Sequence, residues 1–277
     1  MDYIEKESKN VVFDSDGILY LSCYAHVDSG NLELMYADFW SRIGSVTNEL
    51  FKVYKIEKTV IALTSSKNFR DDLTDLWKAD RATKDPSQMT DKQLAASIKS
   101  ESLRSYVYET KKLVLDRIPR DIVTISEVAE ADDIFIDLCN NQNYIGVAMD
   151  SDCIKQCKSP VFNYHSKHWK WMHQGLDDKS IFQHIIYETI VGGHNGSFGI
   201  KGKGKVFANN FVLDLVHHDD PYAQWKMLFP TEEEALLNYR VTDCSQVTND
   251  EVHLVSLEDI ENLFKEHYTT PEDEEEI

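Results

Sequence analysis

Three apolar segments, separated by stretches with helical periodicity, constrain the fold of this chain more than any other feature. They read KNVVFD, TVIAL and YIGVAM and cover residues 9–14, 59–63 and 144–149. Their length and β-branched content predict buried strands. Because strands that alternate with helices pair as a parallel sheet, the sequence predicts an α/β fold with a central, mostly parallel sheet flanked by helices. Ligands of such sheets bind at the carboxyl ends of the strands.

Helical periodicity fills most of the remaining sequence. We expect helices at residues 31–52, 71–80 and 91–117, then a short strand at 122–125 and a helix at 131–140. After residue 175 the pattern becomes mainly helical, with one glycine-rich interruption. The sequence therefore predicts a second, helical region that follows the α/β part.

The composition narrows the class of protein. The 277 residues carry a formal net charge of −19 and five cysteines, an odd number without the spacing of a disulfide framework or a zinc site. The sequence shows no run approaching the roughly 18 apolar residues of a membrane span. We expect a cytoplasmic protein with reduced thiols and no membrane contact. The negative charge argues against a generic nucleic-acid binder, since phosphate affinity needs clustered cations.

Acidic residues gather around the ends of the predicted strands. Carboxylates in such places repel one another, and each is costly to desolvate unless a cation shares the site. Their hard oxygen atoms suit Mg²⁺ or Mn²⁺, and metal sites of this kind commonly serve phosphate chemistry. For the group at 130–133, favourable placement at a helix N-terminus is the alternative explanation. The candidate metal ligands are Asp14, Glu130, Asp132, Asp133, Asp150 and Asp152.

Cations gather locally despite the net negative charge. In the segment GIKGKGKV, residues 199–206, glycines free backbone N–H groups to approach phosphate oxygens, and lysines add positive charge. Lys78 and Arg81 lie three residues apart, and Arg70 precedes them near the end of the second strand. A flexible surface loop and a solvated charged face are the respective alternatives. The candidate nucleic-acid contacts are Arg70, Lys201, Gly202, Lys203, Gly204 and Lys205.

Five sequence segments, taken in order, resemble the 5′-nuclease (flap endonuclease) superfamily. They read VVFDSDGILY, TVIALTSSKNFRDDLTDLWKADR, EVAEADDIFIDL, GVAMDSDC and VGGHNGSFGIKGKGKV, and together they span roughly residues 9 to 210. The resemblance is strongest to phage 5′→3′ exonucleases and phage RNase H. Each motif is weak alone, and the order and spacing of all five carry the resemblance.

The resemblance implies a two-metal phosphodiesterase that uses Mg²⁺ or Mn²⁺ and cuts near the 5′ ends of duplex, flap or RNA–DNA substrates. The six acids named above match the family's metal ligands, and Lys78 and Arg81 match its cations that steer the scissile phosphate. A helical arch would span about 82–117. The segment from Gly199 to Lys205 would belong to a helix–three-turn–helix that holds the duplex backbone, often with K⁺.

These implications give a domain organisation and a set of partners. We expect an α/β nuclease-like domain at 1–178, a helical DNA-binding region at 179–270 and an acidic tail at 271–277. The partners would be duplex, flap or RNA–DNA hybrid nucleic acid, together with replication proteins. We expect the protein to be a monomer.

The chain also departs from the family pattern. The family usually has an acid where this chain has Ser65, and it carries GDxxD where this chain has Gly193 and Gly196. These changes deplete the second metal position and leave Asp150 and Asp152 without their usual partners. Three explanations stay open: a nuclease that works with fewer ligands, a DNA-junction-binding protein with impaired catalysis, and an engineered inactive variant.

A different enzyme class offers a further alternative. The segment FDSDG at 13–17 also looks like the opening motif of haloacid-dehalogenase-type phosphatases, in which the first aspartate attacks phosphorus and the second acts as acid and base. Thr64 or Ser65 would then hold the phosphate. This alternative gives no role to the acids at 130–133 or to the lysine-rich segment.

Overall fold

A six-stranded sheet organises the α/β part of the chain. The computed structural model describes residues 6–65, 68–75, 90–119, 121–164, 171–192 and 198–268. Within these ranges the strand order is β3-β2-β1-β4-β5-β6, and only the β5–β6 pair is antiparallel. The strands are β1 (Ser8–Asp14), β2 (Lys55–Leu63), β3 (Val123–Ile125), β4 (Tyr144–Ala148), β5 (Val161–Asn163) and β6 (Trp171–His173).

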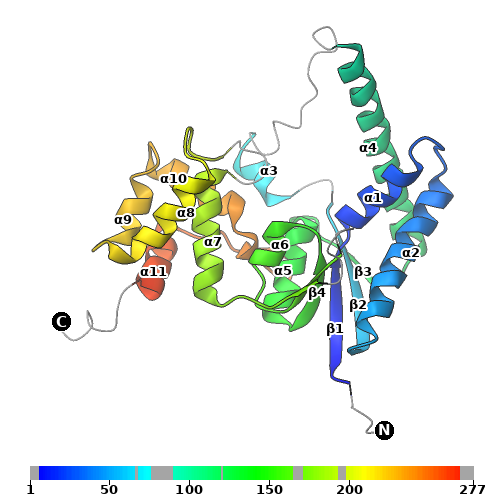
Figure 1. Cartoon of the computed structure of the whole chain (residues 1–277), viewed down its shortest axis with the longest axis horizontal. Helices are drawn as coiled ribbons and strands as arrows, with labels where there is room; N and C mark the ends of the chain where they lie inside the picture. Colours follow the sequence, from blue (N-terminus) through cyan, green and yellow to red (C-terminus); the bar gives the residue numbers. More distant parts are fainter. Residues whose placement is uncertain are drawn as a thin grey trace.

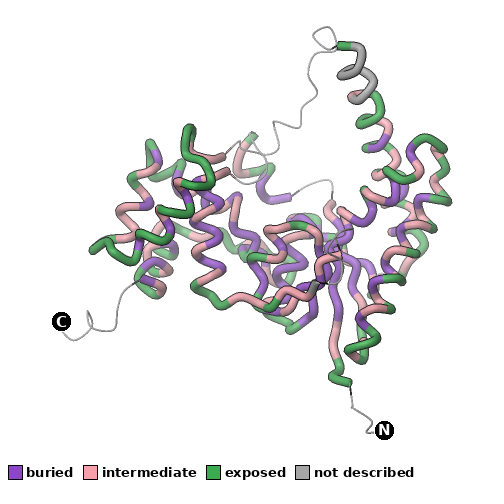
Figure 2. Tube along the Cα trace, in the orientation of Figure 1, coloured by how far each residue is buried: buried purple, intermediate pink, exposed green. Residues whose placement is uncertain are grey.

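Helices cover both faces of this sheet (Figure 1). Because side chains alternate along a strand, Val11 and Phe13 of β1 contribute to one core cluster and Val12 to another. The first cluster packs under α1 (Asp16–His26), α2 (Leu32–Leu50) and α4 (Asp91–Arg117), and the second under α5 (Ala131–Asn141) and α6 (Ser151–Lys155). Figure 2 shows the buried positions following the strands and the inner sides of these helices.

The C-terminal helices build a third core cluster around Trp225, whose indole Nε1 donates a hydrogen bond to Thr189 Oγ1 at 3.1 Å. This pairing satisfies the polar atom of a fully buried indole. The helices are α7 (Asp178–Val191), α8 (Lys205–Asp214), α9 (Pro221–Lys226), α10 (Glu232–Thr242) and α11 (Leu257–Tyr268), with a 3₁₀ turn at Leu215–His217.

The chain then returns from this helical part to the α/β part. The segment consists of a 3₁₀ turn at Cys244–Gln246 and a small hairpin of β7 (Val247–Thr248) and β8 (Glu251–Val252), and it packs against α5. The Asn249 N–H donates to Asp137 Oδ2 at 3.1 Å, and the Cys244 N–H donates to Gln156 Oε1 at 3.0 Å. These bonds fix residues far apart in sequence against one another.

The structure confirms the predicted α/β class and the mostly parallel sheet. The strands expected at 9–14, 59–63 and 144–149 and the helix expected at 91–117 are present. Of the helix expected at 71–80, residues 71–73 are helical as part of α3 (Phe69–Leu73), which ends there because its C-cap Thr74 is extended. Residues 76–80 lie outside the described residues. The division into domains at 178/179 and the role of α4 as an arch stay predictions.

Two observations concern the cysteines and the expectation of no membrane contact. All five cysteines are free and buried. Among the described residues, the structure contains no helix long and apolar enough to cross a membrane.

Candidate metal centre

The carboxyl ends of the central strands and the first turn of α5 meet at one edge of the sheet. Asp14 is the last residue of β1, and β1 pairs in parallel with both β2 and β4, so the residues after all three strands lie at the same edge. There Asp150 follows β4, and its Oδ1 caps α6 by accepting a hydrogen bond from the Asp152 N–H at 2.9 Å. Because parallel strands collect their following residues at one edge, the fold itself gathers these acids.

Asp14 and Asp132 form the centre of this acidic group. Ligand atoms of Asp14, Asp132 and Cys153 all lie within 4.8 Å of one another. Asp14 is 5% exposed, and its Oδ1 has no hydrogen-bond partner among the described residues. A buried carboxylate oxygen without a hydrogen-bond partner is costly in a folded protein, so this atom is suited to bind a cation.

The electrostatics of the pair support this reading. Burial, followed by the charges of Asp16 and Asp150, raises the pKa of Asp14 to about 8. Burial, followed by the charges of Asp14 and Asp150, raises the pKa of Asp132 well above its ordinary value. A cation between two such carboxylates would stabilise their ionised forms and release protons on binding. The donor set therefore fits a divalent cation.

Cys153 is a member of this cluster that the sequence did not reveal. Its Sγ donates a hydrogen bond to Asp132 Oδ1 at 3.4 Å. Burial, followed by the charge of Asp132, raises the pKa of the thiol well above its ordinary value, so the sulfur keeps its proton. A protonated thiol orients Asp132 rather than binding a hard cation. In the sequence, Cys153 is only one of five cysteines without a recognisable spacing.

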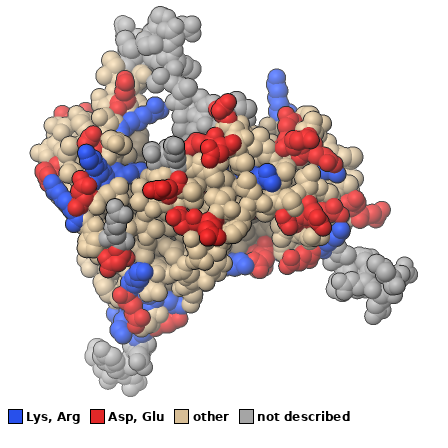
Figure 3. Space-filling model, turned by 180° about the vertical axis from the view of Figure 1, so that it is seen from behind, with Lys and Arg blue, Asp and Glu red and all other residues tan. Residues whose placement is uncertain are grey.

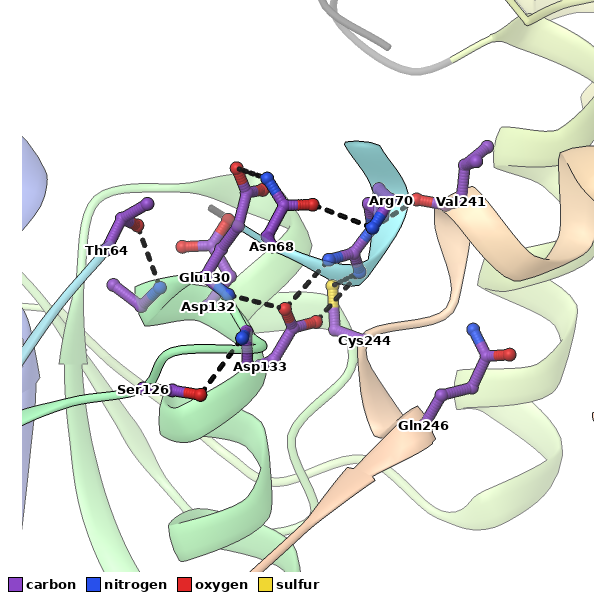
Figure 4. Close-up of polar contacts among 12 residues, drawn as sticks. Thr64, Asn68, Arg70, Ser126, Glu130, Asp132, Asp133, Val241, Cys244 and Gln246 are labelled. Atoms are coloured by element: carbon purple, nitrogen blue, oxygen red, sulfur yellow. Dashed lines mark hydrogen bonds and ion pairs between the residues drawn. The ribbon is translucent and has the colours of Figure 1, made fainter. Parts of the chain in front are cut away.

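Asp133 and Arg70 have a different role from the one predicted. Arg70 Nη1 and Nη2 donate to the two carboxylate oxygens of Asp133 at 2.7 and 2.8 Å, and Arg70 Nε donates to the Val241 carbonyl at 3.0 Å. Figure 4 shows the two side chains facing each other below α3. Their side chains are 2% and 0% exposed. The prediction of Arg70 as a nucleic-acid contact is therefore wrong, and Asp133 serves as its buried partner instead of a free metal ligand.

This ion pair belongs to a network that fixes the start of α5. The Glu130 N–H donates to Asp133 Oδ2 at 2.9 Å, and the Ala131 N–H donates to Thr64 Oγ1 at 2.9 Å. Asn68 Nδ2 donates to Glu130 Oε1 at 3.3 Å, which aims the Glu130 carboxylate from the side of α3 (Figure 4). The end of β2 and the start of α3 thus hold the first turn of α5, and with it Asp132, at the edge of the sheet.

Asp152 lies in a second cluster with two residues of α7. Ligand atoms of Asp152, His184 and Glu188 lie within 4.8 Å of one another. His184 and Glu188 are one helical turn apart, so they share one face of α7, and His184 Nε2 lies 3.7 Å from Asp152 Oδ1. The sequence analysis assigned no role to either residue, although the His-x-x-x-Glu spacing in a predicted helical region was a possible signal. That spacing is equally typical of an ordinary helix face.

The predicted phosphate-binding segment lies in an exposed turn before α8. Lys201, Lys203 and Lys205 are exposed, and Gly202 has φ of +80°, a conformation that favours glycine. Gly204 is the N-cap of α8, and Lys203 Nζ lies 4.0 Å from the centre of the Phe207 ring. The cations are thus presented at a helix N-terminus, as the prediction requires, but nucleic-acid contact stays a prediction.

A second source of positive charge lies at the end of β2, beside the metal centre. A hollow of about 520 Å³ is lined by Thr64, Ser65, Lys111 and Lys112, among others. Lys111 Nζ donates to the Thr64 carbonyl at 2.7 Å and lies 3.4 Å from Asp16 Oδ1. The sequence analysis missed these lysines of α4.

By contrast, the face opposite to that of Figure 1 carries many Asp and Glu side chains over the C-terminal helices (Figure 3).

Several predicted positions lie outside the described residues. They are Lys78, Arg81, Gly193 and Gly196.

Comparisons with known proteins identify the fold. Neither a family model nor a curated protein sequence matches the chain. The crystal structure of the T5 D15 protein co-crystallised with metal ions aligns with a TM-score of 0.60 at 16% identity, covering 94% of this chain and 98% of that one. Two structures of the catalytic core of Rad2 in complex with a DNA substrate give TM-scores of 0.46 and 0.45 at 16% and 15% identity, covering 96% and 97% of this chain and 81% and 91% of theirs. The chain therefore shares its overall fold with the T5 D15 protein.

Proposed function

We propose that this protein is a metal-dependent 5′-nuclease that hydrolyses phosphodiester bonds near the 5′ ends of duplex, flap or RNA–DNA hybrid substrates. The observation that carries the proposal is the pair of close, desolvated carboxylates of Asp14 and Asp132, with an unpartnered buried oxygen on Asp14. The pair sits at the carboxyl edge of the sheet in a chain that shares its fold with the T5 D15 protein. The metal ions in the T5 D15 crystal are consistent with the same chemistry.

The residues of the centre fall into metal ligands and residues that position them. Asp14 and Asp132 would hold a Mg²⁺ or Mn²⁺ ion, with Glu130 and Asp150 at its margin. A bound divalent ion supplies Lewis-acid activation of the phosphate and lowers the pKa of bound water. The Cys153 thiol orients Asp132, and the buried pair of Arg70 and Asp133 keeps the first turn of α5 in place.

The remaining groups would bind the substrate. Lys201, Lys203 and Lys205 would hold the phosphate backbone of the duplex, with K⁺ at the same turn, and Lys78 and Arg81 would steer the scissile phosphate. Lys111 and Lys112 line the hollow beside the centre, where they offer positive charge to an approaching strand. We further propose that the protein acts as a monomer in the cytoplasm and works with replication proteins.

The proposal accounts for more of the site than the phosphatase hypothesis does. A phosphatase of the haloacid-dehalogenase type would need Asp14 and Asp16 but would leave Asp132 and Glu130 without a task. In the structure, the charge of Asp132 lies against Asp14, and Asp16 accepts a hydrogen bond from the Thr64 N–H at 3.2 Å. Metal binding by Asp14 and Asp132 uses both carboxylates.

The test is cleavage of a duplex with a labelled 5′ flap in Mg²⁺, in Mn²⁺ and in EDTA. We expect metal-dependent cleavage that Asp14→Asn abolishes, while duplex affinity in EDTA stays unchanged. Asp28→Asn is the matched control, because Asp28 is exposed and pairs only with Lys99 in the described contacts. Flap binding without cleavage would assign the chain to the alternative of a DNA-junction-binding protein. Equal cleavage by Asp14→Asn would refute the metal centre.

A further inference from the structure

The second acidic cluster contains a buried imidazole nitrogen without a hydrogen bond. His184 Nε2 lies 3.7 Å from Asp152 Oδ1 and 3.9 Å from Glu188 Oε1. Both distances exceed the usual length of a hydrogen bond, and Nε2 has no hydrogen-bond partner among the described residues. The His184 side chain is 8% exposed and that of Glu188 is 9% exposed. A buried ring nitrogen aimed between two carboxylates needs a further group to satisfy it.

The spacing of these three atoms suits a shared metal ion. Donors that each lie roughly 2.1 Å from one ion are separated from one another by about 3 to 4 Å. The two separations that involve His184 Nε2, 3.7 and 3.9 Å, fall in that interval, and the two carboxylates lie within 4.8 Å of each other. The ring of His184 also stacks on Tyr187, with the ring planes 22° apart, which fixes the direction of the nitrogen.

The place of this cluster relates it to the first centre. Asp152 belongs to the second cluster and Cys153, the next residue, to the first. Two adjacent residues of α6 therefore serve two neighbouring groups of ligands. In the 5′-nuclease motif the two acids would stand where this chain has Gly193 and Gly196. Here α7, which ends just before these glycines, brings His184 and Glu188 to Asp152 instead.

We propose that Asp152, His184 and Glu188 form a second divalent-cation site whose nitrogen donor makes it selective for a transition metal such as Mn²⁺ or Co²⁺ over Mg²⁺. Imidazole suits transition metals, whereas Mg²⁺ prefers a shell of oxygen atoms. Cation binding at this site stands on its own geometry, and only its contribution to cleavage rests on the proposed nuclease function.

The test is metal binding by the full-length protein, measured as stoichiometry and affinity for Mn²⁺ by titration calorimetry and as the visible absorption of bound Co²⁺. We expect two Mn²⁺ ions per chain. His184→Gln and Glu188→Gln, which keep the size of each side chain, should each remove one ion or weaken it at least tenfold, and His184→Gln should alter the Co²⁺ spectrum. Circular dichroism and thermal melting without metal verify that each variant is folded.

Two controls separate this site from its alternatives. His253 Nε2 lies 3.9 Å from Glu251 in an exposed pair, so His253→Gln should leave both ions in place. Asp14→Asn should remove the other ion and leave the Co²⁺ spectrum of the histidine site. Unchanged Mn²⁺ stoichiometry and an unchanged Co²⁺ spectrum in His184→Gln would overturn the inference, with the nuclease proposal intact. Loss of one ion in that variant from a chain that cleaves no flap would support the inference and refute the nuclease proposal.

Discussion

Replacement of Arg70 by methionine should destabilise the protein strongly, because it leaves the Asp133 charge buried and unpaired. The side chains are 2% and 0% exposed and share hydrogen bonds of 2.7 and 2.8 Å, and Arg70 also donates to the Val241 carbonyl at 3.0 Å. Removing one partner of a buried ion pair costs about 3–5 kcal/mol. The free energy of unfolding, measured in urea by circular dichroism, should fall by that amount.

A second variant and a matched control make this prediction specific. Arg70→Met/Asp133→Asn removes both charges and keeps an acceptor for the Glu130 N–H, so it should recover part of the lost stability. Arg117→Met is the control. Arg117 makes the same bidentate contact with Glu33, but the Arg117 side chain is 41% exposed and that of Glu33 is 65% exposed. An exposed pair of this kind contributes little to stability, because water and salt screen the two charges. If Arg70→Met costs only about 0.5 kcal/mol, as an exposed residue would, and weakens flap binding instead, the structural role of Arg70 is refuted.

Three further predictions follow from the same structure. Burial raises the pKa of Asp14 from 3.8 to about 8, so the folded protein favours the protonated carboxyl more than the unfolded chain does. The stability linked to this proton is fully present below pH 3.8 and is lost as the pH rises to about 8. The melting temperature in EDTA should therefore fall across this window, and Asp14→Asn should flatten the fall; equal slopes would contradict the pKa shift. Lys201, Lys203 and Lys205 are changed together to alanine. If each lysine contacts one phosphate, the plot of the logarithm of the binding constant against the logarithm of the salt concentration should become less steep by about 2.7. Fluorescence anisotropy with a labelled duplex measures the slope, and an unchanged slope would rule out a phosphate clamp. A methyl group added at Gly146 of β4 would collide with the Phe135 ring of α5, so Gly146→Ala should destabilise the protein by about 1–3 kcal/mol. Urea unfolding measures this loss. Gly44→Ala is the control, because a methyl group at this position in α2 meets open space and alanine favours the helix, so stability should stay the same or rise.

Regular local patterns allowed much of the fold to be predicted. β1 and β4 are short apolar segments, so their type follows from length and composition. α4 is a long segment without proline or glycine, which favours a helix. α1 was not predicted, although Ile18, Leu19 and Cys23 form its buried side. The segment DGILYLSCYAH begins directly after β1, and no separate loop marks the change from strand to helix.

The site was predicted less completely because its decisive contacts join distant parts of the chain. The position of Arg70 beside other cations suggested nucleic-acid binding, but the partners that bury it include Val241, 171 residues away. The proposed role of His184 and Glu188 depends on Asp152 of α6, whose Oδ1 lies 3.7 Å from His184 Nε2, and the spacing of the two residues on one helix does not reveal this contact. The role of Cys153 likewise depends on its contact with Asp132, 21 residues away.

The most direct test of a metal-dependent 5′-nuclease uses one duplex that carries a 5′ flap and a 3′ flap of equal length, each labelled with a different dye. The protein is first incubated with this substrate in EDTA, and then an excess of Mg²⁺ or Mn²⁺ is added. The account predicts no release in EDTA and release of the 5′-flap dye alone after the metal is added. Release of both dyes, release without metal, or release of neither dye from a folded, flap-bound protein would contradict it.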